Sequence, residues 1–84
     1  MEIRVAIFED NKLVRDALEA ILNGTGGYTC SGVFADGNNW ERNIKSSQPH
    51  VVLMDIEMPG LNGIEVTQRI HTHFPDVKIL IQTV

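Results

Sequence analysis

The sequence has little cysteine, little positive charge and no long apolar run. Each of these features argues against one class of structure or function. A single cysteine, Cys30, excludes an internal disulfide and fits a small buried hydrophobe in a reducing compartment. No apolar stretch approaches the ~20 residues of a membrane span, and the N-terminus lacks the apolar core of a signal peptide. Seven Lys and Arg against eleven Asp and Glu leave a net charge of −4, which argues against a nucleic-acid-binding module. We therefore expect one small cytoplasmic domain with no membrane contact.

Two periodicities alternate along the 84 residues. A nearly continuous, β-branched apolar run predicts a buried strand over residues 3–8, and further strands are expected over residues 28–34, 51–54 and 78–84. Apolar residues at helical spacing predict helices between these strands, the first over residues 11–23. Asn38 is expected to cap a short second helix whose Trp40 contacts the sheet, and Asn62 is expected to cap the third.

Strands that alternate with helices predict a parallel sheet covered by helices on both faces. In such a fold the carboxyl ends of all strands meet at one edge, where ligands bind. Glu9 and Asp10 directly follow the first strand, Asp55 ends the third, and Thr83 lies near the end of the fourth. These residues should therefore be neighbours in space.

Carboxylates gathered at one edge repel one another, and partial burial makes each anion less stable. A divalent cation offsets this repulsion, and carboxylate, carbonyl and water oxygens suit the octahedral shell of Mg²⁺. A carboxylate can also accept a phosphoryl group as an aspartyl phosphate. Solvated acidic loop ends are the alternative for any one of these residues, but they explain the convergence of all of them poorly.

The acid pair Glu9-Asp10, the stretch PHVVLMDIEMPGLNG (residues 49–63) and KILIQT (residues 78–83) resemble the receiver domain of bacterial two-component response regulators. The pattern D-x-x-M-P-x-x-x-G from Asp55 to Gly63, with the upstream acids, is highly specific. FPDVKIL and the opening IRVAIFEDNKLVRDAL resemble most the receivers that precede a helix-turn-helix DNA-binding domain.

The resemblance implies a role for each matching residue. Asp55 would be the phosphoacceptor, taking the phosphoryl group from a sensor histidine kinase or phosphotransfer protein. Asp10 would bind Mg²⁺ directly with Asp55, Glu9 would bind through water, and Glu57 would contribute its backbone carbonyl. Thr83 would be the switch hydroxyl that moves toward the phosphorylated aspartate. The module itself would not be an enzyme, beyond Mg²⁺-dependent self-phosphorylation from a phosphodonor.

Three positions depart from the family pattern. Glu9 stands where the family most often has aspartate, a variant that should weaken little. His50 stands where an acid is common before the third strand, and we expect it only to solvate the strand start. Val84 replaces the small residue usual after the switch threonine, and its bulk could narrow access to the site.

The resemblance also implies a flavodoxin-like, doubly wound parallel sheet, here of four strands in the order 2-1-3-4 with three helices. The sequence reaches only the fourth strand, so we expect residues 1–84 to be a partial receiver domain without the family's lysine after the fifth strand. Lys78 begins the fourth strand at the opposite edge and cannot replace that lysine. We expect that residues 1–84 do not include an output domain, through which DNA would be bound to regulate transcription.

An uncovered fourth strand would expose an unpaired backbone edge and the side chains of Ile79, Leu80, Ile81 and Val84. This predicts a homodimer or an exchanged dimer through this region. Two other functions stay open. Without the lysine, the chain could be a receiver-like interaction module that does not carry phosphate. An aspartyl-phosphate phosphatase of the haloacid dehalogenase type fits less well, because its nucleophile follows the first strand and a second aspartate stands where this chain has Glu57.

Overall fold

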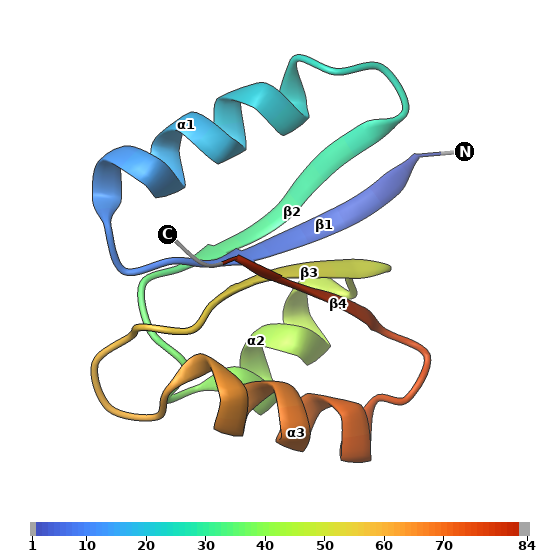
Figure 1. Ribbon diagram of the computed structural model, residues 1–84. Helices are drawn as coiled ribbons and strands as arrows, with labels where there is room; N and C mark the ends of the chain where they lie inside the picture. The colour runs from blue at the N-terminus through green and yellow to red at the C-terminus, as the bar shows by residue number, and fades with distance from the viewer. Residues whose placement is uncertain (1, 83–84) are drawn as a thin grey trace.

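The computed structural model describes residues 2–82, which form one parallel sheet with helices on both faces (Figure 1). The elements follow one another as β1 (Ile3–Phe8), α1 (Lys12–Asn23), β2 (Tyr28–Phe34), α2 (Trp40–Ser47), β3 (Val51–Asp55), α3 (Gly63–His73) and β4 (Lys78–Gln82). The strand order β2-β1-β3-β4 and the three helices confirm the predicted flavodoxin-like arrangement. Among the described residues, no helix is long and apolar enough to cross a membrane.

The two faces of the sheet are covered unequally. α1 lies alone on one face and contacts β1 and β2, whereas α2 and α3 lie together on the other (Figure 1). The main core is on the α2–α3 side, because alternate residues of the central strands point there. Its members are Ala6, Phe8, Ile44, Val52, Met54, Met58, Val66 and Ile70, all of them buried.

The caps show why the helices begin where they do. The Asn11 side chain accepts from the amides of Leu13 and Val14, and Asn62 accepts from Glu65 at 3.0 Å. Both therefore satisfy amides that the first helical turn leaves unpaired. The cap predicted at Asn38 is wrong, since the residue before α2 is Asn39 and its side chain makes no capping bond.

Two side chains have contacts that the sequence did not predict. Trp40 packs against the main core, and its ring centroid also lies 5.3 Å from that of His73 and 6.5 Å from that of Phe74, so it joins α2 to the end of α3 as well. His50 does more than solvate a strand start. Its Nδ1 accepts from the backbone N–H of Arg4 at 2.9 Å and ties the start of β3 to β1.

Candidate functional site

The carboxyl ends of β1 and β3 bring three acids together at one edge of the sheet. One carboxylate oxygen from each of Glu9, Asp10 and Asp55 lies within 4.8 Å of the others. They meet because β1 and β3 are hydrogen-bonded neighbours whose register places Phe8 beside Met54, so that the next residues of both strands emerge together. Glu9 and Asp55 are buried, with 3% and 6% exposure, whereas Asp10 is open to solvent.

These acids line a hollow of about 340 Å³, which Asn11, Val14 and Glu57 complete. Glu57 donates its backbone N–H to Asp55 Oδ1 at 3.1 Å and so fixes one oxygen of that carboxylate. The predicted residue Thr83 lies outside the described residues. The described members of the predicted set therefore share one hollow.

The loop after β3 is shaped by two glycines. Gly60 adopts a φ of +79°, in the left-handed region that L side chains rarely enter. At Gly63, an added Cβ would lie 2.8 Å from the Ile56 Cα, because α3 begins directly against the end of β3. The Gly63 N–H also donates to the Ile56 carbonyl at 2.9 Å. The close approach at Gly63 and its hydrogen bond to Ile56 hold the start of α3 against the segment that carries Asp55 and Glu57.

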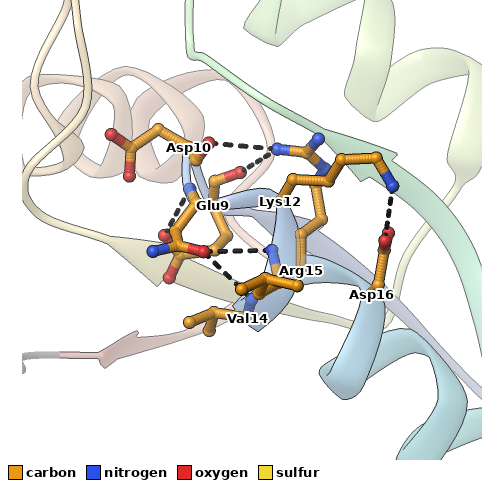
Figure 2. Close-up of polar contacts among 8 residues, drawn as sticks. Glu9, Asp10, Lys12, Val14, Arg15 and Asp16 are labelled. Carbon is orange, nitrogen blue, oxygen red and sulfur yellow. Dashed lines mark hydrogen bonds and ion pairs between the residues drawn. The ribbon is translucent and has the colours of Figure 1, made fainter.

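Arg15 binds the backbone of the loop that carries Glu9 and Asp10. The sequence analysis did not predict a role for this residue. Its Nη1 donates to the backbone carbonyls of Glu9 at 2.9 Å and Asp10 at 3.3 Å (Figure 2). The guanidinium thus holds the backbone of the loop, and within residues 2–82 it forms no ion pair with these carboxylates. Arg15 lies four residues after the capping residue Asn11 and therefore on the same side of α1. This spacing is the only feature of the sequence that could have predicted its contact with the loop of Glu9 and Asp10.

Burial raises the pKa of the Glu9 carboxyl above its ordinary value of 4.5, and the neighbouring Asp55 raises it further. The backbone amide of Asn11, which donates to Glu9 Oε2 at 3.0 Å, acts in the opposite direction. A bound cation would relieve the same repulsion without a proton. The donor set consists of carboxylate oxygens with no sulfur or imidazole nitrogen, so it fits a hard cation such as Mg²⁺.

A parallel sheet of this order with side chains gathered at its carboxyl edge is typical of α/β domains that bind ligands at that edge. The family model of the response regulator receiver domain matches residues 5–84, and the chain belongs to that family. It is thus a receiver domain sequence of two-component response regulators, which sets the phosphatase alternative aside.

Curated relatives are response regulators of several kinds. The chain is 38% identical over 82 residues to the uncharacterized transcriptional regulatory protein YxjL of Bacillus subtilis, covering 98% of the chain and 38% of that protein. It is 34% identical to the response regulator GacA of Pseudomonas protegens, again covering 98% of the chain and 38% of the relative. A protein-glutamate methylesterase/protein-glutamine glutaminase of Burkholderia thailandensis is 37% identical, with 22% of its length covered.

Solved structures agree with the fold. The response regulator domain of Thermotoga maritima CheB superposes with a TM-score of 0.89 at 31% identity, covering 96% of this chain and 60% of that one. The response regulator ChrA of a heme-sensing two-component system gives 0.85 at 34% identity, covering 99% of this chain and 39% of that one. The chain thus spans 22–38% of the length of these curated relatives and 39–60% of these two solved chains.

Proposed function

We propose that this chain is a phosphoacceptor module of a cytoplasmic two-component phosphorelay and that Asp55 receives the phosphoryl group. The observation that carries the proposal is the grouping of Glu9, Asp10 and Asp55 within 4.8 Å of one another at the carboxyl edge of the sheet. Family membership supplies the reaction class, and the transcriptional regulators among the relatives favour transcription as the regulated output.

In the proposed reaction an oxygen of Asp55 attacks the phosphorus of a phosphohistidine on the partner kinase or phosphotransfer protein. The P–O bond forms as the P–N bond breaks, and the histidine nitrogen takes up a proton. Glu57 keeps one Asp55 oxygen occupied through its backbone N–H, which leaves the other oxygen as the nucleophile. Burial of Asp55 limits competing water around that oxygen.

We propose Mg²⁺ as the cofactor, held by Asp10, Asp55 and the Glu57 backbone carbonyl, with Glu9 contributing through water. When bound, Mg²⁺ supplies the positive charge that offsets the charge on the transferring phosphoryl group. The switch role of Thr83 remains part of the proposal on the strength of the family motif alone. The three grouped carboxylates support the cation, since they have no cationic partner among the ion pairs of the described residues.

The test is an intact-mass measurement after incubation with acetyl phosphate and Mg²⁺. Wild type should gain one phosphoryl group, and Asp55→Asn should gain none. Asp76→Asn is the matched control, because Asp76 is an exposed carboxylate at the opposite edge of the sheet. A wild type that binds Mg²⁺ but gains no mass would refute phosphoacceptance by this chain and support a phosphate-independent interaction module.

We also propose that the 84-residue chain pairs with a second copy through β4. This strand is hydrogen-bonded on one side only among the described residues, and its Leu80 and Ile81 are 59% and 46% exposed. Unpaired edge strands with apolar side chains favour pairing with another edge.

A further inference from the structure

A hydrogen bond joins the last described strand to the acid cluster. The Nε2 of Gln82, at the end of β4, donates to Oε1 of Glu9 at 3.3 Å, across 73 positions of sequence. β3 lies between β1 and β4, and the register pairs Gln82 with Asp55. The Gln82 side chain therefore reaches past the strand end that carries Asp55 to contact Glu9.

This contact completes the set of protein donors around Glu9. Oε2 accepts from the backbone N–H of Asn11 at 3.0 Å, and Oε1 accepts from Gln82. Each oxygen of this buried carboxylate thus has one donor, and each keeps a lone pair for a further contact. A carboxylate held at both oxygens has little freedom to rotate.

We propose that Gln82 is a positioning residue for the divalent cation: it holds the Glu9 carboxylate in orientation and so ties the end of β4 to the cation site. The inference rests on the proposed function, since it deepens the role given there to Glu9. Partners that orient the groups around a metal ion commonly change metal affinity when they are removed, even though they never touch the ion.

The length of Glu9 is part of the argument. An aspartate at position 9 would be one methylene shorter, which would lengthen the 3.3 Å contact beyond hydrogen-bonding range if the backbone stayed in place. Gln82 should therefore matter only when position 9 is a glutamate. This dependence separates positioning from a general effect of Gln82 on stability.

The experiment measures the Mg²⁺ dissociation constant of the 84-residue chain by calorimetric titration. Gln82→Met, which keeps the side-chain shape but removes the donor, should weaken binding about tenfold, the lower end of such effects. In a Glu9→Asp background the same substitution should change the constant less than about twofold, as expected when the coupled partner is already lost. Gln68→Met, at an exposed position of α3, is the matched control and should bind as wild type does.

Two further measurements keep the test decisive if Gln82→Met folds poorly. Gln82→Asn retains an amide that is one methylene too short and should weaken Mg²⁺ binding as Gln82→Met does. In ¹⁵N spectra of the wild type, the side-chain amide signals of Gln82 should shift on addition of Mg²⁺, and those of Gln68 should not.

The outcomes separate this inference from the proposed function. If the wild type binds no Mg²⁺, both fail. If the wild type binds Mg²⁺ and is phosphorylated, but Gln82→Met and Gln82→Asn bind Mg²⁺ within twofold of it, only the positioning role is overturned. An equal loss of affinity in the Glu9→Asp background also overturns that role.

Discussion

Gly63 shows how a missing side chain lets α3 begin directly against the end of β3. A Cβ added there would collide with the backbone of Asp55 and Ile56, which cannot move aside as a flexible side chain can. We expect Gly63→Ala to lower the free energy of unfolding by about 1–3 kcal/mol, the usual cost of forcing atoms into a filled space. Urea unfolding measures the change.

Gly26→Ala is the control for that substitution, because a Cβ at Gly26 would meet nothing within 4 Å. Its effect should stay within about 0.5 kcal/mol, as for other surface changes. If both variants lose the same free energy of unfolding, the close approach at Gly63 is not the cause of the loss in Gly63→Ala.

Cys30 provides a pH-dependent prediction. Burial raises the pKa of its thiol above the ordinary value of 9.0, and the charge of Glu19 adds to this shift, whereas a backbone hydrogen bond with Gly32 acts in the opposite direction. The folded state therefore keeps the proton longer than the unfolded state does. The resulting stabilisation is complete below pH 9 and is lost as the pH rises through the folded-state pKa.

Urea unfolding between pH 8 and pH 10 should thus show stability falling more steeply in the wild type than in Cys30→Ser. At pH 8, iodoacetamide should alkylate Cys30 more slowly in the folded protein than in urea, since the thiolate is the reactive form. Equal alkylation rates in the two states would contradict the raised pKa.

Among the helices, the asparagine caps give a matched comparison. Asn62 accepts from the Glu65 amide at the start of α3, whereas Asn39 makes no capping bond at the start of α2. We expect Asn62→Ala to cost about 1 kcal/mol of unfolding free energy and Asn39→Ala to cost much less. Denaturant unfolding of both variants decides this, and equal costs would mean that the Asn62 bond adds no stability.

The same caps show how far sequence reasoning reaches. Periodicity and turn residues predicted the described strands and helices. They did not predict burial, since β2, β4 and α1 contain no fully buried residue. Periodicity and turn residues could not choose between Asn38 and Asn39 before α2, since capping depends on the backbone angles of the loop.

The grouping of Glu9, Asp10 and Asp55 was predictable because the carboxyl ends of parallel strands share one edge. The contact of Gln82 with Glu9 was not, because it depends on strand register and on how far a side chain reaches across β3.

At the scale of the whole molecule, helices and core residues are distributed unequally over the two faces of the sheet. One face of the sheet carries two helices and the main core, and the other carries α1 alone, over β1 and β2 (Figure 1). β4 contributes Ile79 to the edge of the core but leaves Leu80 on the side of α1 with 59% exposure. Apolar area and an unpaired strand edge therefore lie together on one flank.

This arrangement predicts self-association of the 84-residue chain. Two copies related by a two-fold axis could pair their β4 edges antiparallel, which satisfies the free N–H and C=O groups and brings exposed leucines together.

Sedimentation velocity at high micromolar concentration should show a dimer of the 84-residue chain. Leu80→Lys should shift the population toward monomer, since it places a cation where the two strands would meet. Leu13→Lys makes the same change at an 81% exposed leucine of α1, outside the strand that would pair, and should leave the dimer intact. A monomeric wild type, or equal dissociation by both variants, would rule out pairing through this strand.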